Sequence, residues 1–198
     1  MYLFGASGHG KVIAEILESR GVVVDGFIDA DPLKSLVLGY NVVKNIPSDK
    51  VKMIIAIGNN KIRKKIVYEY PSLSYGIAIH SRANISPRIE LGNGTVIMAG
   101  ATVNVDVVIG QHCIVNTNVS VDHDCIIEDY VHLSPNVALA GNVSVGEGTH
   151  IGIGASVIQG IKIGAWCTVG AGSVVIRDIP DGCTVVGNPG RIIKTNTN

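Results

Sequence analysis

The chain has 198 residues, 46% of them apolar, which is enough to build the core of one or two domains. Its 16 basic and 16 acidic residues cancel, so charge gives no reason to expect binding to nucleic acid or to an anionic membrane. No apolar stretch reaches the roughly 20 residues that span a bilayer, and the first residues lack a signal-peptide pattern, so we expect a cytoplasmic protein.

Residues 1–75 are predicted to form a small α/β domain. Apolar runs and turn residues place strands at 2–4, 22–28 and 51–57 and helices at 11–20 and 61–70. Strands that alternate with helices imply a small parallel sheet, similar to one half of a Rossmann fold. The predicted buried stripes of the two helices are Val12, Ile13, Ile16 and Leu17, and Ile62, Ile66, Val67 and Tyr70.

A glycine-rich turn, Gly5-Ala6-Ser7-Gly8-His9-Gly10, lies between the first strand and the first helix. Such a turn presents backbone N–H groups and a helix N-terminus to a phosphate, so Gly8, His9 and Gly10 are candidate nucleotide ligands. Asp29 and Asp31 follow the second strand, where a ribose or base contact is expected. The domain has room for about one mononucleotide half, which favours a nucleotide-sugar over a dinucleotide. Alternatively, the glycines only permit tight packing of strand and helix.

Residues 76–198 carry a hexapeptide repeat. Every sixth residue from Ile79 to Val175 is Ile, Leu or Val, at seventeen positions without a register slip. Three hexads close a triangular coil of 18 residues, so the sequence predicts an all-β parallel β-helix with a C-terminal tail. Burial of one aliphatic side chain per hexad contributes about 1.5–3 kcal/mol, less than the backbone entropy it must offset, so we expect an oligomer.

A second column, four residues after each aliphatic one, carries mostly small residues and no charged residue from Ala83 to Ser173. Cys113, Cys125 and Cys167 occupy this column. We therefore interpret the cysteines as small buried residues rather than as disulfide partners, catalytic thiols or zinc ligands.

Five segments resemble the nucleotide-aminosugar N-acetyltransferases of the PglD and NeuD type, which are left-handed β-helix (hexapeptide-repeat) acyltransferases. These segments are Gly5 to Gly10, Ala56 to Asn60, Ser120 to Cys125, Val131 to Pro135 and Val186 to Gly190, spread over nearly the whole chain. The resemblance implies a left-handed winding, a homotrimer, and acetyl-CoA as co-substrate in the groove between neighbouring β-helices. It implies a nucleotide-amino sugar as acceptor, with a UDP-4-amino-4,6-dideoxy sugar favoured.

The resemblance also assigns further site residues. His132, Ala171 and Pro189 would lie along the acetyl-CoA groove, whereas Gly58, Asn59 and Asn116 would line the nucleotide-sugar pocket. Asn59 also precedes the second helix as a candidate cap. The base, the position of the amine and the acyl chain length stay open at this point.

Acetyl transfer to an amine needs a base for the proton and donors for the developing oxyanion. His123 is the candidate base, since its ring titrates near neutral pH and it lies at a turn two residues after Val121. Asp124 is a candidate to orient the imidazole, although neighbours on an extended chain usually point apart. One coil later stands Gly141, where a missing side chain leaves room for the thioester and a backbone N–H is a candidate oxyanion donor.

Three other functions fit parts of the pattern. O-acetylation of sialic acid or another sugar uses the same fold. A gamma-class carbonic anhydrase needs three histidine ligands for zinc and typically a pair five residues apart, a spacing absent from His112 onward, so we expect no metal. A non-catalytic nucleotide-sugar-binding scaffold would have no need of His123 and Asp124 placed one coil from Gly141.

Overall fold

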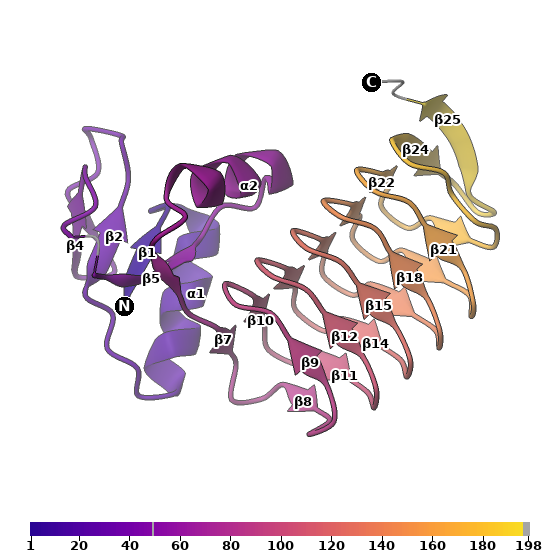
Figure 1. Ribbon diagram of the computed structural model, residues 1–198, viewed down its shortest axis with the longest axis horizontal. Helices are drawn as coiled ribbons and strands as arrows, with labels where there is room; N and C mark the ends of the chain where they lie inside the picture. The colour runs from indigo at the N-terminus through magenta and orange to yellow at the C-terminus, as the bar shows by residue number, and fades with distance from the viewer. Residues whose placement is uncertain (49, 196–198) are drawn as a thin grey trace.

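The structure is a computed structural model that describes residues 1–48 and 50–195. An N-terminal α/β part is followed by a β-helix whose coils run away from it (Figure 1). The elements of the first part are β1 (Tyr2–Phe4), α1 (Gly8–Ser19), β2 (Gly26–Ile28), β3 (Leu36–Val37), β4 (Tyr40–Val43), β5 (Lys52–Ile55), α2 (Asn60–Glu69) and β6 (Ser74–Tyr75).

The N-terminal sheet has the strand order β3-β4-β2-β1-β5-β6 and is parallel except for the β3–β4 hairpin. The predicted parallel core and both helices are confirmed, but the hairpin and β6 were not foreseen. The hairpin turns at Leu38 and Gly39, with φ values of 51° and 81°. Positive φ at both positions usually calls for an Asn-Gly pair, and leucine gives no such signal in the sequence.

The buried faces of the helices differ in part from those predicted. In α1, Ile13, Ile16 and Leu17 are buried as expected, but Val12 is 39% exposed. In α2 and at its C-cap, the predicted Ile62 and Tyr70 are 48% and 38% exposed, and Arg63 is buried instead with only 1% of its surface exposed. The expected cap is present, since the side chain of Asn59 accepts a hydrogen bond from the N–H of Ile62.

The β-helix has three walls, built of two-residue strands except for β24 and β25 at the C-terminal end. The first wall holds β7 (Ala78–Ile79), β10 (Val96–Ile97), β13 (Ile114–Val115), β16 (His132–Leu133), β19 (His150–Ile151), β22 (Thr168–Val169), β24 (Cys183–Val186) and the antiparallel β25 (Arg191–Thr195). The second holds β8 (Asn84–Ile85), β11 (Thr102–Val103), β14 (Ser120–Val121), β17 (Ala138–Leu139), β20 (Ser156–Val157) and β23 (Val174–Val175). The third holds β9 (Glu90–Leu91), β12 (Val108–Ile109), β15 (Ile126–Ile127), β18 (Ser144–Val145) and β21 (Lys162–Ile163).

In the regular coils, each strand pairs in parallel with the strand one coil later, as in Val115 with Leu133 and Leu133 with Ile151. These partners are 18 residues apart, so the predicted coil of three hexads is confirmed. At the C-terminal end the spacing changes, since Thr168 of β22 pairs with Thr184 of β24, and β25 is antiparallel. The aliphatic column and the column of small residues together form one buried cluster, which includes Cys113, Cys125 and Cys167. All four cysteines are buried and free, as predicted.

The N-terminal part is fixed to the β-helix by a shared apolar cluster. Outward side chains of the first wall, Ala78, Val96 and Ile114, are buried in one cluster with Ile13 and Leu17 of α1. Burial of each larger aliphatic side chain contributes about 1.5–3 kcal/mol, so α1 is held firmly on this wall. No helix of residues 1–48 and 50–195 is long and apolar enough to cross a membrane.

Candidate active site

His123 and Asp124 lie at the corner between the second and third walls. His123 Nδ1 and Asp124 Oδ2 are 2.7 Å apart, and the two side chains are 53% and 58% exposed. Neighbouring residues can meet here because Asp124 has a positive φ of 60°, which turns its carboxylate back toward the ring. The predicted contact is therefore present, and it leaves Nε2 of His123 facing away from the carboxylate.

Gly141 stacks one coil from His123, as the repeat predicts. A Cβ atom added to Gly141 would lie 2.6 Å from Cε1 and 2.7 Å from Nε2 of His123, so the imidazole fills the space that a side chain would need. Within the described residues the Gly141 N–H has no hydrogen-bond partner, whereas the N–H of Asn142 donates to the His123 carbonyl. The arrangement brings together the His123 imidazole, the Asp124 carboxylate and the unpaired backbone N–H of Gly141.

The charge around His123 favours its protonated form. The hydrogen bond to Asp124 and the nearby Asp122 carboxylate raise the pKa of His123 above 6.5. Asp122 is itself held by the Asn104 side chain at 2.8 Å and by the His123 N–H at 2.9 Å, and these hydrogen bonds lower the pKa of its carboxyl. Asp122 and Asn104 were not predicted to belong to this cluster.

A second polar cluster lies on the first wall, beyond the region that α1 covers. The outward column of this wall runs Ala78, Val96, Ile114 and then changes to His132 and His150, all in register. The two imidazoles stack with ring centroids 4.8 Å apart, as the 18-residue spacing predicts. The column thus becomes polar where the apolar contact with α1 ends.

Hydrogen bonds fix the tautomer of His132. Its Nδ1 lies 3.3 Å from the carbonyl of Gly58, which only accepts, so Nδ1 carries the proton. Its Nε2 then accepts from Asn116 Nδ2 at 3.3 Å. Burial, together with His150, Arg63 and His9, lowers the pKa of His132 to about 3 and keeps the ring neutral. His132, Asn116 and Gly58 are thus brought together.

His150 has a partner that was not predicted. Its Nε2 lies 2.8 Å from the hydroxyl of Ser134, which is 7% exposed. Burial and the charge of Arg63 lower the pKa of His150. The pair extends the polar cluster of His132 along the wall.

The glycine turn leads into α1, which begins at Gly8. An added Cβ would clash at Gly10, 2.2 Å from the carbonyl oxygen of Gly5, but would meet nothing within 4 Å at Gly8. Packing therefore explains Gly10, whereas Gly8 borders open space. His9 lies between them, and its buried Nε2 has no hydrogen-bond partner in the described part of the chain. Burial and the charge of Arg63 lower the pKa of His9 to about 4.

Asp29 supports the glycine turn. Its Oδ2 accepts from the N–H of Ala6 and from Lys34, both at 2.9 Å, and its Oδ1 accepts from the N–H of Asp31 at 3.0 Å. Burial alone would raise the pKa of Asp29, but these hydrogen bonds outweigh it and lower the pKa. Asp31 accepts from the N–H of Leu33. Both carboxylates are thus already engaged by the protein, beside the predicted ribose site.

Ala171 and Pro189 lie apart from His123 within one chain. Ala171 is exposed at the corner between the first and second walls, one coil from Ile153. Pro189 is exposed in the turn between β24 and β25 and follows a cis peptide bond.

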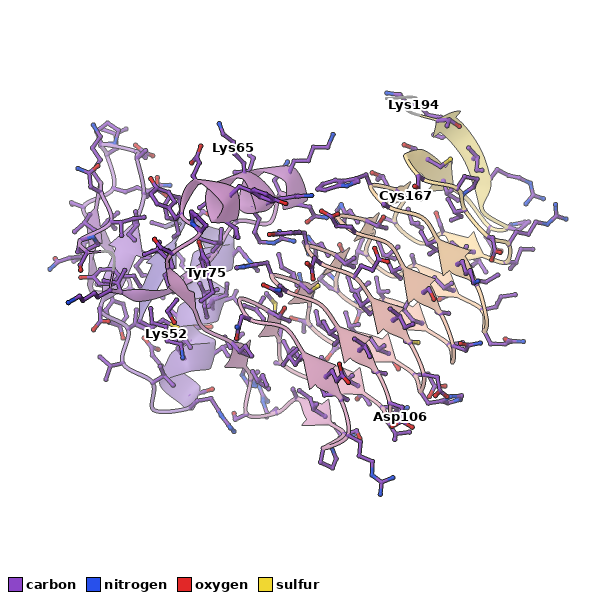
Figure 2. The ribbon with its side chains drawn as sticks, in the orientation of Figure 1. Lys52, Lys65, Tyr75, Asp106, Cys167 and Lys194 are labelled. Carbon is purple, nitrogen blue, oxygen red and sulfur yellow. The ribbon has the colours of Figure 1, made fainter. Side chains whose placement is uncertain are left out.

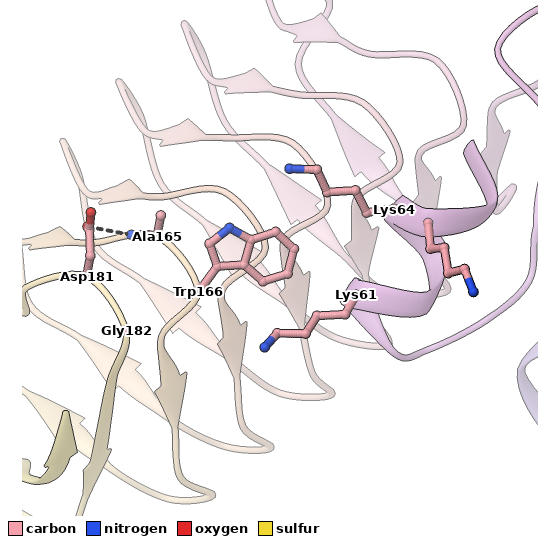
Figure 3. A pocket seen from close by; sticks show the side chains of 7 residues that line it. Lys61, Lys64, Ala165, Trp166, Asp181 and Gly182 are labelled. Carbon is pink, nitrogen blue, oxygen red and sulfur yellow. Dashed lines mark hydrogen bonds between the residues drawn. The ribbon is translucent and has the colours of Figure 1, made fainter. Parts of the chain in front are cut away.

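A cavity of about 530 Å³ lies between α2 and the corner that joins the third and first walls. Figure 3 shows Lys61 and Lys64 reaching from α2 toward the indole of Trp166, with Nζ atoms 5.9 and 5.2 Å from the ring centroid. Lys64 also pairs with Glu147. A smaller cavity of about 200 Å³ shares Lys61 and Trp166 and is lined by His150 and Gly58.

Within residues 1–48 and 50–195, no three His, Cys, Asp or Glu side chains are grouped as ligands for a metal ion. His112, one of the histidines that a zinc site would need, is instead buried between Tyr75 and Tyr130.

Two family models match the chain. Residues 1–70 match the PglD N-terminal domain, and residues 142–177 match the bacterial transferase hexapeptide (six repeats). Of solved structures, PerB from Caulobacter crescentus in complex with CoA and GDP-perosamine is 41% identical, with 98% of this chain and 96% of that chain covered and a TM-score of 0.92. This chain belongs to the PglD-like family of sugar N-acetyltransferases.

Two other members have the same architecture. The acetyltransferase domain of PglB from Neisseria gonorrhoeae, in complex with acetyl coenzyme A, is 37% identical over 97% of this chain and 98% of that chain, with a TM-score of 0.91. WeeI from Acinetobacter baumannii is 30% identical over 97% and 98%, with a TM-score of 0.90. The β-helix is accordingly the left-handed one of this family.

One curated relative, an uncharacterized protein of Acanthamoeba polyphaga mimivirus, is 28% identical over 102 residues. The match covers 49% of this chain and 21% of that protein, so the chain spans about a fifth of the length of this relative.

Proposed function

We propose that this protein transfers the acetyl group of acetyl-CoA to the amino group of a nucleotide-linked amino sugar, with His123 as general base. We assign nucleotide-sugar binding to residues 1–75 and acetyl transfer to residues 76–198. The observation that carries the proposal is His123, oriented by Asp124 and stacked on the bare backbone of Gly141. The relatives that bind GDP-perosamine with CoA, or acetyl coenzyme A alone, support the two substrates.

The residues at the His123 corner can accept and donate the protons that the reaction moves. With Nδ1–H donated to Asp124, neutral Nε2 takes the proton of the amine as its nitrogen attacks the thioester carbonyl. The Gly141 N–H is the candidate donor to the oxyanion that forms. When the C–S bond breaks, the imidazolium returns its proton to the CoA thiolate. Asp124 stabilises the imidazolium between these steps.

The first-wall cluster is the proposed pocket of the amino sugar, so His132, which the resemblance places along the acetyl-CoA groove, is assigned here to the acceptor side. The glycine turn would hold the diphosphate at the N-terminus of α1. The sugar would then reach the amide of Asn116 and the neutral ring of His132, which lies against Gly58. A UDP-4-amino-4,6-dideoxy sugar is our first candidate, and a GDP-linked amino sugar is the second because PerB binds GDP-perosamine.

A homotrimer is part of the proposal. In a triangular coil, the corner between the second and third walls lies opposite the first wall, so His123 points away from the His132 cluster of its own chain. Exposed aliphatic side chains on the third wall, Val108 and Ile126, are candidates for contact between chains. Packing of one chain against the next would place His123 at the neighbour's pocket.

Subunit complementation tests this arrangement. His123→Ala and Asn116→Ala proteins, each inactive alone, should regain activity when they are unfolded and refolded together, because some interfaces then hold one intact site. The control is a mixture of the two folded variants that has not been unfolded, in which the subunits are not exchanged. Mixed oligomers that stay inactive would show that one chain supplies the whole site.

An acceptor panel tests the reaction itself. Purified protein with acetyl-CoA is offered UDP- and GDP-linked amino sugars, matched sugars with a hydroxyl in place of the amine, and free sialic acid. Thiol release and a mass gain of one acetyl group are followed. The proposal predicts release that depends on the amine. Release with hydroxyl acceptors only would indicate an O-acetyltransferase, and nucleotide-sugar binding without acetyl-CoA binding would indicate a scaffold.

The cytoplasm is the proposed compartment of the protein. The four free thiols support a reducing compartment.

A further inference from the structure

Arg63 is a buried cation that has no carboxylate partner among residues 1–48 and 50–195. Its five N–H donors are all used: Nε donates to the His112 carbonyl at 2.7 Å, Nη1 to the carbonyls of Ile57 and Gly58 at 2.9 and 3.3 Å, and Nη2 to Asn60 Oδ1 and the Tyr130 carbonyl at 2.9 and 2.8 Å. The side chain is 1% exposed. Burial of a charge costs several kcal/mol unless its geometry is well satisfied, so a simple apolar contact would be the cheaper way to join the two parts.

The acceptors of Arg63 belong to both parts of the molecule. Ile57 and Gly58 form the loop after β5, whereas His112 and Tyr130 occupy the same corner of the β-helix one coil apart. Asn60 continues this pattern, since its Nδ2 donates to the carbonyl of Gly148, one further coil along, at 2.9 Å. Through Arg63 and Asn60, the first turn of α2 is therefore hydrogen-bonded to three successive coils. Figure 2 shows Tyr75, which packs edge-on to His112, at the same junction.

Gly58 connects this junction to the proposed sugar pocket. Its carbonyl accepts from both Arg63 and His132, and it is this second bond that sets the proton of His132 on Nδ1. The other ring nitrogen then holds the amide of Asn116, whose Oδ1 accepts from the N–H of Thr117 at 2.8 Å. One chain of hydrogen bonds thus runs from Arg63 to the amide that would face the acceptor.

We propose that Arg63 is a positioning residue for acetyl transfer. It sets the loop of residues 57–60 against the β-helix, and through the Gly58 carbonyl it fixes the His132 tautomer and the orientation of Asn116. Its kinetic consequence rests on the proposed function. A lysine would keep the charge, but its three N–H donors cannot satisfy the five acceptors that the guanidinium of Arg63 reaches.

Steady-state kinetics of Arg63→Lys and Arg63→Met test the proposal. We expect kcat/KM for the amino sugar to fall about 10- to 100-fold in both, as for a misplaced binding group, while the KM for acetyl-CoA stays within about twofold. Glu147→Gln is the matched control, because it removes the ion pair with Lys64 across the same junction without touching Gly58. Circular dichroism and thermal melting identify variants that are folded. A folded Arg63→Lys protein with wild-type kinetics would overturn the proposal.

Histidine ¹⁵N NMR supplies a readout that does not depend on activity or on a variant that folds. In the wild-type protein, His132, assigned with a His132→Gln variant, should have Nδ1–H and stay neutral at pH 5. In Arg63→Lys we expect a mixture of tautomers. An Nε2–H tautomer in the wild type would refute the hydrogen-bond chain. If no acetyl transfer occurs with any acceptor, the proposed function fails, and these spectra still decide the role of Arg63.

Discussion

Gly141→Ala is the sharpest perturbation of the proposed acyl-transfer centre. Gly141 does not have a positive φ, so alanine fits its backbone. The new Cβ, however, would lie 2.6 Å from Cε1 of His123, against a normal contact of about 3.5–4 Å, so the ring must move by about 1 Å. The ring is half exposed and can swing outward, so we expect the stability to change by less than about 1 kcal/mol.

The Gly141→Ala variant is expected to lose catalytic rate rather than stability. A displacement of about 1 Å at a reacting group costs on the order of 100-fold in rate, which is about 2.7 kcal/mol of transition-state stabilisation. Thiol release with saturating acetyl-CoA and the best acceptor measures kcat, and thermal melting reports the fold. The double variant His123→Ala/Gly141→Ala should be no slower than His123→Ala alone, because the two changes act on one group.

Gly146→Ala is the matched control, since there the added Cβ would lie 2.5 Å from the backbone nitrogen of Ala165, which cannot swing away. This variant should lose stability instead. A Gly141→Ala protein that is folded and turns over within twofold of the wild-type rate would refute the requirement for a residue without a side chain beside the His123 ring.

Two further predictions concern protons. Because Asp124 raises the pKa of His123 and the base must be neutral, kcat should rise with pH through a pKa above 6.5. Asp124→Asn should shift the rising part of the kcat–pH profile to lower pH and lower the kcat reached at high pH. A profile that does not shift would show that Asp124 does not act on the His123 base. Burial keeps His132, His9 and His112 neutral in the folded state, with pKa values of about 3, 4 and 4, while the unfolded chain takes up these protons below about pH 6.5. The free energy of unfolding by urea should therefore fall between pH 7 and 5, by up to about 1.4 kcal/mol per pH unit for each histidine, and His112→Phe should reduce the slope. Equal stability at both pH values would contradict the burial of these rings.

The β-helix was predictable because its constraint is periodic. A column of aliphatic residues that repeats every six positions specifies both the coil and the residues that stack, which is how His123 was matched to Gly141 and His132 to His150. The same 18-residue spacing also contains the position at which the helix α1 leaves the wall, which was not predicted. The outward column that runs from Ala78 through Ile114 to His132 marks where the apolar contact of α1 with the wall ends.

The junction of the two parts could not be predicted in the same way. Arg63 stands in a run with Lys64 and Lys65, which in a sequence reads as a solvated helix face. Its burial depends on carbonyls at His112 and Tyr130, which no local pattern places near α2. Asp29 illustrates a similar limit, since its place after a strand was evident, but its bonds to Ala6 and Lys34 depend on the folded turn.

The turnover of His123→Ala tests the central claim most directly. Its side chain is exposed, so the variant should fold and melt as the wild type does. With the best amine acceptor and saturating acetyl-CoA, the account predicts that kcat falls by about 10² to 10⁴, the usual contribution of a general base. A folded His123→Ala protein with a kcat near that of the wild type would contradict the account, because the acetyl-transfer centre would then lie elsewhere.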